Sequence, residues 1–242
     1  MTQPLHHTLD GTADPARCPL CGGDNRCAME IEQTTGVKQP PCWCVDATFS
    51  PELLERLPVH TGPWRGLGAG PNVFALESAM DECARAAGAD PVQFRLDHIA
   101  DPRLAGVLRM AVDAARSTAP ATATSTRHGR GVACGIYKEK SYAAVVADVQ
   151  VDPATGAVRV LHMWCAHDCG HVINADQVRA QCEGNLVWGL GMALIEQLPV
   201  GTSEVAAMNF AESPIPRMGE VPPLQVMLVD STAPPTGAGE TA

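Results

Sequence analysis

The amino-acid sequence predicts an α+β fold that follows a small cysteine-rich module. Five of the ten cysteines lie between residues 18 and 44, and few apolar residues accompany them. Beyond residue 61, apolar residues recur first at helical spacing and then in the alternation typical of strands. Proline and glycine residues between 58 and 63 interrupt the chain. We therefore expect a first module at residues 1–58 and a second domain at residues 61–242.

Composition indicates a globular protein and argues against a nucleic-acid partner. Hydrophobic residues make up 45% of the 242 residues, charged residues make up 18%, and the formal net charge is -10. Nucleic-acid binding depends on a basic surface that this charge balance does not provide. Apolar runs are shorter than the ~20 residues that cross a bilayer, and the first residues lack the pattern of an export signal. We therefore expect a cytoplasmic protein without a membrane span.

Apolar spacing and end signals predict four helices. A short helix at 50–57 begins with Ser-Pro-Glu, which suits an N-cap and a first turn. A helix at 73–87 stops at Gly88, a third helix opens at 101–102, and a long helix is expected at 176–198. The expected apolar stripes of the second and third helices are Val73, Leu76, Met80, Cys83 and Ala87, and Leu104, Val107, Leu108 and Ala111.

Strands are predicted on both sides of a tight turn. Val149 and Val151 alternate with polar neighbours, and Asp-Pro-Ala-Thr-Gly at 152–156 is typical of a turn. The chain then returns from Val158 as a second strand. A late strand is expected at 224–229.

The long helix carries three interior glycines, Gly184, Gly189 and Gly191. Each of them costs about 0.5–1 kcal/mol relative to alanine. Such glycines permit close approach by a ligand or another backbone segment, and close helix packing is an equal explanation.

A glycine-rich stretch, residues 62–71, comes directly before the 73–87 helix. Its backbone N–H groups and the positive end of the helix suit an anionic ligand, and Arg65 adds a forked donor. A glycine-rich turn without a ligand explains the pattern at least as well.

Two cysteine-containing runs differ in what they predict. Cys-x2-Cys is a common half-site for structural zinc, with disulfides or free thiols as the alternative. The candidate metal ligands are Cys18, Cys21, Cys27, Cys42 and Cys44. In contrast, the Cys and His residues at 165–171 alternate along the chain, so in an extended strand each lies about 6.6–7 Å from the next on the same face. Tetrahedral zinc holds each ligand atom about 2.0–2.3 Å from the ion. Successive positions on one strand cannot surround the ion, so no metal is expected at 165–171.

Glu240 follows a Pro-Pro kink and a Gly-x-Gly turn near the carboxyl end. A carboxylate on such a constrained loop suits a general base, although an exposed terminal glutamate is the alternative. Because Glu240 is two residues from the last residue of this sequence, we expect fraying there and a pKa raised by the terminal carboxylate.

Four motifs, in order, resemble the molybdopterin-binding subunits of the xanthine dehydrogenase/aldehyde oxidase family, most closely the isoquinoline 1-oxidoreductase type. They are 62–78, which contains Gly-Pro-Trp-Arg-Gly; 90–96, Asp-Pro-Val-Gln-Phe-Arg-Leu; 168–174 with Gln-Cys-Glu-Gly at 181–184; and 234–240, Pro-Pro-Thr-Gly-Ala-Gly-Glu. The resemblance covers residues 61–242. It implies the C-terminal part of a molybdopterin-binding domain, a truncated one with a mixed sheet and packed helices.

The resemblance also implies a function. It implies a molybdenum-cofactor-dependent oxidoreductase subunit that hydroxylates an N-heteroaromatic or aldehyde substrate, with water as the oxygen source. Electrons would pass to a two-iron two-sulfur partner subunit. Glu240 matches the catalytic glutamate, and the matching cofactor-binding positions are Arg65, Gly66, Gly68, Gln181 and Gly184. The alternatives are a non-catalytic fusion fragment and a small zinc-binding module with an incidental C-terminal extension.

Residues 1–58 resemble a different family, the cysteine-rich CWC proteins. Cys18-Pro-Leu-Cys21 and Pro41-Cys-Trp-Cys44 carry the likeness. Zinc binding is the expectation for this module.

Overall fold

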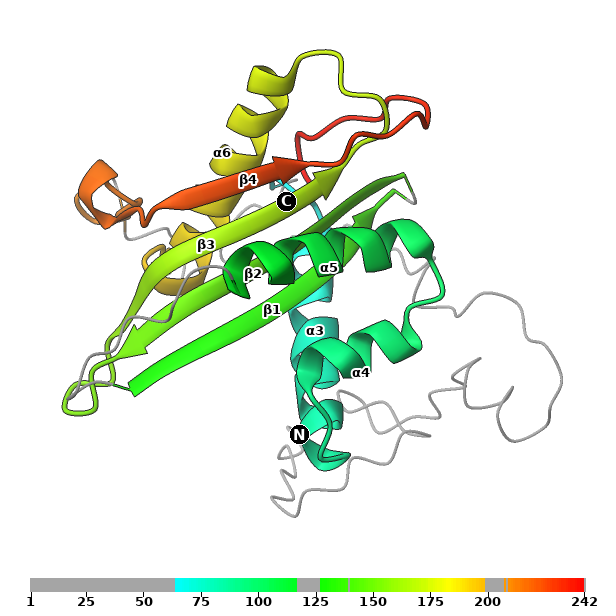
Figure 1. Ribbon diagram of the computed structural model, residues 1–242. Coiled ribbons are helices and arrows are strands. Elements are labelled where there is room, and N and C mark those ends of the chain that lie inside the picture. The colour runs from blue at the N-terminus through cyan, green and yellow to red at the C-terminus, as the bar shows by residue number, and fades with distance from the viewer. Residues whose placement is uncertain (1–63, 117–126, 139, 199–206, 208, 242) are drawn as a thin grey trace, which may run out of the picture. The chain divides into compact units, whose positions relative to one another are not determined.

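A four-stranded mixed sheet forms the centre of the domain (Figure 1). The computed structural model describes residues 64–116, 127–138, 140–198, 207 and 209–241. The strand order is β1-β2-β3-β4. The strands are β1 (Arg127–Tyr137), β2 (Ser141–Val151), β3 (Val158–Asp168) and β4 (Leu224–Leu228). β1, β2 and β3 are antiparallel neighbours, whereas β4 pairs with β3 in parallel. This mixed sheet with packed helices confirms the predicted α+β class.

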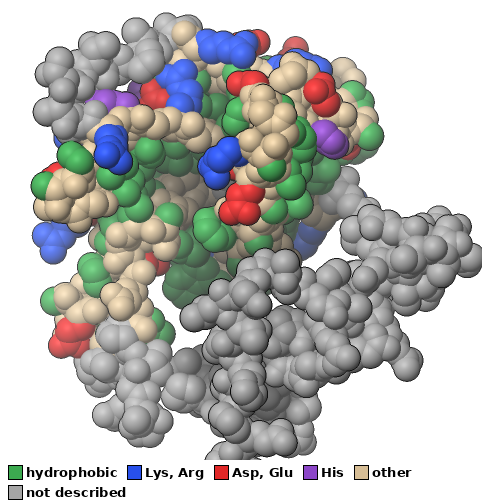
Figure 2. Space-filling model, turned by 90° about the horizontal axis from the view of Figure 1, so that it is seen from below, with side chains coloured by type: hydrophobic (Ala, Val, Ile, Leu, Met, Phe, Trp, Pro, Cys, Tyr) green, Lys and Arg blue, Asp and Glu red, His purple; other side chains and the backbone are tan. Residues whose placement is uncertain are grey.

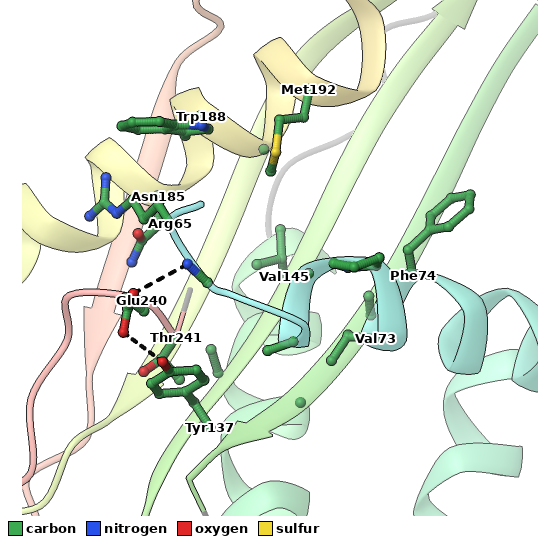
Figure 3. A pocket seen from close by; sticks show the side chains of 18 of the residues that line it. Arg65, Val73, Phe74, Tyr137, Val145, Asn185, Trp188, Met192, Glu240 and Thr241 are labelled. Carbon is green, nitrogen blue, oxygen red and sulfur yellow. Dashed lines mark hydrogen bonds between the residues drawn. The ribbon is translucent and has the colours of Figure 1, made fainter. Parts of the chain in front are cut away.

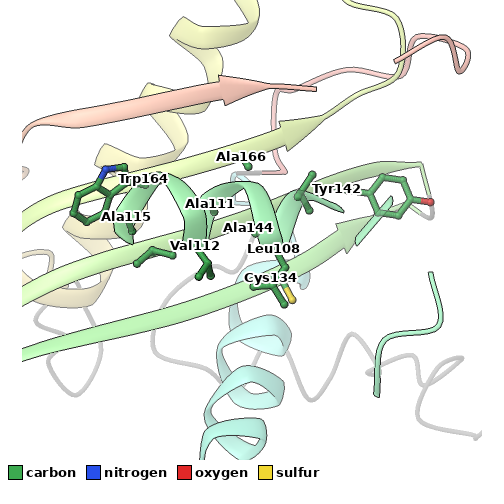
Figure 4. Close-up of a cluster of buried hydrophobic side chains, with 11 residues drawn as sticks. Leu108, Ala111, Val112, Ala115, Cys134, Tyr142, Ala144, Trp164 and Ala166 are labelled. Carbon is green, nitrogen blue, oxygen red and sulfur yellow. The ribbon is translucent and has the colours of Figure 1, made fainter. Parts of the chain in front are cut away.

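Helices cover both faces of the sheet. α5 (Pro102–Arg116) packs on one face, where Leu108 lies in a cluster with Trp164 and Ala166 (Figure 4). α6 (Ala175–Leu194) packs on the other face, where Cys165 and Leu186 belong to a second cluster. Consecutive residues of β3 thus point to opposite cores, as the pleat of a strand requires.

The predicted hairpin and the stripe of α5 are confirmed. Asp152 donates its N–H to the carbonyl of Ala157 at 2.9 Å, and Gly156 closes the turn with φ 74. Val107, Leu108 and Ala111 are buried. α6 ends at Leu194 rather than at residue 198, and β1, the eight-residue α4 (Pro91–His98) and the 3-10 helix η2 (Met218–Glu220) were not predicted. The helix predicted at 50–57 lies outside the described residues.

α3 (Ala69–Ala86) begins earlier than predicted but ends as expected. Gly88 has φ 64 and donates to Arg85, while Ala89 donates to the carbonyl of Ala84, which together form a Schellman C-cap. The predicted apolar stripe is wrong in part, because Leu76 is 60% exposed and Cys83 is also exposed.

The buried residues of α3 are Ala84 and the charged Glu77, so the inward side of this helix is partly polar. Glu77 accepts a hydrogen bond from Nε of Arg95 at 2.8 Å and another from the backbone N–H of Cys134 at 2.8 Å. Arg95 is 1% exposed and also binds Asp81. This ion-pair network joins α3, α4 and β1. It explains why apolar spacing alone did not identify the face of α3 that packs inward.

Candidate functional site

A cavity of about 790 Å³ lies over the α6-facing side of the sheet, between the start of α3 and the middle of α6 (Figure 3). Its floor includes Ala143 and Val145 of β2. Trp64, Phe74 and Trp188 are exposed aromatic side chains among its walls. Hydrophobic side chains also gather around a hollow on the face shown in Figure 2. The other lining residues that bear on the site are Arg65, Gly66, Tyr137, Asn185, Met192 and Glu240.

The loop that carries Glu240 is fixed by side chains from three separate elements. Ser141 donates its hydroxyl to the carbonyl of Gly237 at 2.9 Å. Asn185 of α6 donates to the carbonyl of Ala238 at 3.1 Å. Nε of Arg65 donates to the carbonyl of Gly239 at 2.8 Å. The carbonyls of residues 237–239 each accept a side-chain hydrogen bond. The fraying expected near the last residue therefore does not extend to the loop before Glu240.

Further hydrogen bonds hold the beginning of the same loop. Thr236 donates its N–H to the carbonyl of Cys169 at 2.8 Å, and its hydroxyl lies 2.7 Å from that of Ser141. Gly170 has φ 75, and a Cβ atom there would lie 2.8 Å from the carbonyl oxygen of Ala233. The turn after β3 thus packs directly on the loop that delivers Glu240.

Glu240 lies on the cavity wall with both carboxylate oxygens in contact with donors. The hydroxyl of Tyr137 donates to Oε2 at 2.6 Å, and the N–H of Gly66 lies 3.4 Å from Oε1 (Figure 3). The side chain is half-buried. The Tyr137 hydrogen bond, followed by the Gly66 N–H, lowers the pKa of Glu240 below its ordinary value. The rise expected from the terminal carboxylate is therefore wrong, since the two hydrogen-bond donors stabilise the ionised form of Glu240.

The sequence-predicted site residues are brought together around Arg65. Nη2 of Arg65 donates to Oε1 of Gln181 at 3.0 Å. A Cβ atom on Gly184 would lie 3.3 Å from Nη1 of Arg65, so the glycine allows the guanidinium to rest on α6. Gly66 lines the cavity, whereas Gly68, Gln181 and Gly184 do not. Gly68 instead occupies the N-cap position of α3.

The other interior glycines of α6 have different surroundings. A Cβ atom on Gly191 would collide with Glu196 Oε1 and lie 2.9 Å from Pro216. Gly189 lines the cavity and has no atom within 4 Å of a Cβ position. Close approach therefore explains Gly184 and Gly191, while Gly189 leaves room in the cavity.

Tyr137, Asn185 and Ser141 were missed by sequence reasoning. Each makes its contact to the Glu240 loop across a separation of 53 or more residues. The sequence offers one signal for Asn185, which directly follows the Gln-Cys-Glu-Gly motif at 181–184 in the same predicted helix. No local pattern marked Tyr137, which ends a strand that was itself not predicted.

Cys165 of β3 packs in the core on the α6 side of the sheet. Cys165 and Cys182 are fully buried and belong to one cluster with Ala238. Contact with Cys182, together with burial, raises the pKa of the Cys165 thiol. Across the described residues there is no group of three or more His, Cys, Asp or Glu side chains arranged to hold a metal ion. The candidate ligands Cys18, Cys21, Cys27, Cys42 and Cys44 lie outside the described residues.

Within the described part of the chain, no helix combines the length and apolarity needed to cross a membrane.

Known proteins give two family matches along the chain. Residues 75–222 match the molybdopterin cofactor-binding domain family, and residues 18–62 match the cysteine-rich CWC family. A nicotinate dehydrogenase chain from Pseudomonas putida is 36% identical over 205 residues, which are 78% of this chain and 17% of that protein. The beta chain of isoquinoline 1-oxidoreductase from Brevundimonas diminuta is 35% identical over 195 residues, 78% of this chain and 24% of that protein. The chain therefore spans a quarter or less of these relatives.

A solved structure supports the fold. Aldehyde oxidoreductase from Desulfovibrio gigas aligns with a TM-score of 0.60 and 14% identity over 76% of this chain and 38% of that one. The family match, the two relatives and the meeting of Arg65, Gln181 and Glu240 agree with one another. The chain belongs to the molybdopterin cofactor-binding domain family of the xanthine dehydrogenase type.

Proposed function

We propose that residues 61–242 are the part of a molybdenum hydroxylase subunit that places a general base against the molybdenum cofactor. The observation that carries this proposal is the meeting of the Arg65 loop and Glu240 at one cavity wall. These segments are 174 residues apart in sequence, yet Gly66 contacts Glu240 and Arg65 binds Gly239. A carboxylate held beside a glycine-rich loop and a helix start is the arrangement that base catalysis next to an anionic cofactor needs.

The residues of the cavity fit the molybdopterin cofactor. The guanidinium of Arg65, which is positively charged, lies beside Gln181. The positive end of the α3 dipole lies at the cavity wall formed by Ala69 and Gly70. Both features suit the phosphate of a pterin cofactor. Gly66 adds no side chain to this wall, and Gly184 leaves space on α6 for the Arg65 guanidinium. When bound, the cofactor supplies the redox centre that oxidises the substrate carbon.

The chain itself supplies the base and the substrate cavity. Because its pKa is lowered, Glu240 is ionised at neutral pH and can accept a proton from the hydroxyl group, derived from water, that adds to the substrate. Trp64, Phe74 and Trp188 give the cavity flat apolar walls, which favour an N-heteroaromatic or aldehyde substrate. The names of the two relatives, nicotinate dehydrogenase and isoquinoline 1-oxidoreductase, support the same substrate class. An iron–sulfur subunit is the proposed electron acceptor.

Cofactor content tests this proposal. The full chain, produced in a bacterium that makes the molybdenum cofactor, is expected to contain molybdenum and pterin in equal amounts. Arg65→Ala should lower both contents. Arg159→Ala, which removes an exposed arginine that lines no part of the cavity, should not. Absence of both molybdenum and pterin from the wild-type chain, with a broad thermal transition, contradicts the proposal and indicates a non-catalytic fragment.

For the segment that matches the CWC family, we propose zinc binding by its cysteines. Thiolates at Cys-x2-Cys spacing are the support. Zinc measured in the purified chain should approach one ion per chain, and Cys18→Ser with Cys21→Ser should remove it. A chain with zinc but neither molybdenum nor pterin would indicate a zinc module with an incidental extension.

A further inference from the structure

Tyr137 makes the shorter of the two contacts to the Glu240 carboxylate. Its hydroxyl donates to Oε2 at 2.6 Å, whereas Gly66 N–H and Oε1 are 3.4 Å apart (Figure 3). A hydrogen bond of 2.6 Å to an ionised oxygen is of the charge-assisted kind, which is roughly twice as strong as a neutral one. The two oxygens are therefore not equivalent, and Oε1 is the less firmly bound of the two.

The turn after β1 aims Tyr137 at the cavity. Lys138 has φ 50, a left-handed conformation that costs energy in a residue with a side chain. Lys140 donates its N–H to the carbonyl of Tyr137 at 3.2 Å and closes the turn. Nζ of Lys138 lies 5.1 Å from the centroid of the Tyr137 ring, within range of a cation–π contact. The backbone and the neighbouring cation thus both restrain the tyrosine.

We propose that Tyr137 is a positioning residue that binds Oε2 of Glu240 and leaves Oε1 as the oxygen that accepts the proton. Tyr137 keeps its own proton and only donates a hydrogen bond, while Glu240 gains one proton at Oε1. The inference rests on the proposed function in naming Glu240 as the base. The hydrogen bond and its effect on the carboxylate do not depend on that function.

The surroundings of Glu240 define what the titration of this pair should show. Tyr137 faces it from β1, Lys138 from the following turn and Arg65 from the loop before α3, whereas α6 contributes the neutral Asn185. Tyr137 makes the largest contribution that lowers the pKa of Glu240, ahead of Lys138 and Arg65. In return, Glu240 is the main cause of the raised pKa of Tyr137. Removal of Glu240 should therefore change the pKa of Tyr137, and removal of the Tyr137 hydroxyl should change the pKa of Glu240.

The chain contains only two tyrosines, which makes the experiment direct. The full chain without cofactor is labelled with 13C at the tyrosine Cζ and titrated by NMR. Tyr142 lies in the core beneath α5 and serves as an internal reference for folding. In Glu240→Gln, the titration of Tyr137 should move to lower pH while that of Tyr142 stays in place. An unchanged Tyr137 titration would overturn the proposal.

A second pair of variants gives an independent measurement. With 13C-labelled glutamate, the carboxyl signal absent from Glu240→Gln is assigned to Glu240. Its pKa should rise in Tyr137→Phe and rise less in Lys138→Met, which removes a charge but keeps the hydrogen bond. A Glu240 pKa that stays unchanged in Tyr137→Phe but rises in Lys138→Met would mean that charge and not the hydrogen bond acts on Glu240, and would also overturn the proposal.

The loaded enzyme gives a readout that separates positioning from folding. Tyr137→Phe should move the acidic limb of the kcat/KM profile to higher pH and leave molybdenum and pterin contents unchanged. If the chain binds no cofactor, the proposed function fails while the NMR coupling still decides the role of Tyr137. If cofactor binds but the coupling is absent, only the inference on Tyr137 fails.

Discussion

The carbonyl oxygen of Gly239 accepts a hydrogen bond of 2.8 Å from Nε of Arg65, 174 residues earlier in the chain. This bond links the glycine-rich loop before α3 to the loop that ends in Glu240. Through Gln181, the same guanidinium also reaches α6. Arg65 therefore fixes the geometry of the candidate base as well as the proposed cofactor wall.

Gly170 and Gly156 form a matched pair for testing how closely the turn after β3 packs on the Glu240 loop. Both have positive φ, 75 and 74. A Cβ atom on Gly156 meets nothing within 4 Å, whereas one on Gly170 meets the carbonyls of Ala233 and Pro234. Gly156→Ala should cost about 1–2 kcal/mol of unfolding free energy from its backbone conformation alone. Gly170→Ala should lower the unfolding free energy, measured by urea denaturation, by more than Gly156→Ala does. Equal decreases would show that the Glu240 loop can move to accommodate the added Cβ atom.

Asn185→Leu tests the hold on the carbonyl of Ala238. The variant keeps the side-chain size but removes the donor, so a buried acceptor is left without its partner. Such a loss costs about 1–3 kcal/mol. Chemical denaturation should show this decrease, and hydroxylase activity should fall with it because the next two residues lead to Glu240. A variant as stable as the wild type would mean that the loop does not depend on α6.

Arg95→Met should be among the most destabilising substitutions in the domain. It leaves the buried carboxylate of Glu77 without its partner, and breaking such a pair costs about 3–5 kcal/mol. The double variant with Glu77→Gln should recover part of that loss. As a control, Arg116→Met removes a guanidinium whose side chain is 68% exposed and should change the unfolding free energy by less than about 0.5 kcal/mol. Similar losses for Arg95→Met and Arg116→Met would contradict the assigned role of the network.

Asp168 makes the stability of the domain depend on pH. Burial opposes ionisation, but the hydrogen bonds from Arg103 outweigh it, and the pKa of Asp168 is lowered. A lowered pKa adds stability above the unfolded value of about 3.9, and this stability is lost as the pH falls through the folded pKa. Asp168→Asn should flatten that acidic limb in denaturation measured from pH 6 to pH 2. Asp176→Asn, with a side chain 96% exposed, should not.

The sequence predicted the elements whose signals are local. The hairpin turn at 152–156 and the α5 stripe follow from glycine conformation and helical spacing, and the structure contains both. Glu240 and the Arg65 loop were identified by resemblance to a family. Their proximity came from the structure, because hydrogen bonds across 174 residues leave no periodic trace.

Features that depend on partners distant in sequence were missed. β1 was missed because its glycine and arginine residues resemble a loop, and it becomes a strand by pairing with β2 along its whole length. The buried face of α3 was assigned to apolar residues because nothing local showed that Glu77 meets Arg95. Tyr137 escaped notice for the same reason, since its partner lies 103 residues away.

Hydroxylase turnover in Glu240→Gln, compared with Glu82→Gln, tests whether Glu240 is the base. Glu82 is an exposed carboxylate on α3 that lines no part of the cavity. With equal molybdenum and pterin contents, turnover of an N-heteroaromatic substrate should fall about 10²–10⁴-fold in Glu240→Gln, the usual contribution of a general base. Glu82→Gln should keep the wild-type rate. Wild-type turnover in a cofactor-loaded Glu240→Gln would show that Glu240 is not the base.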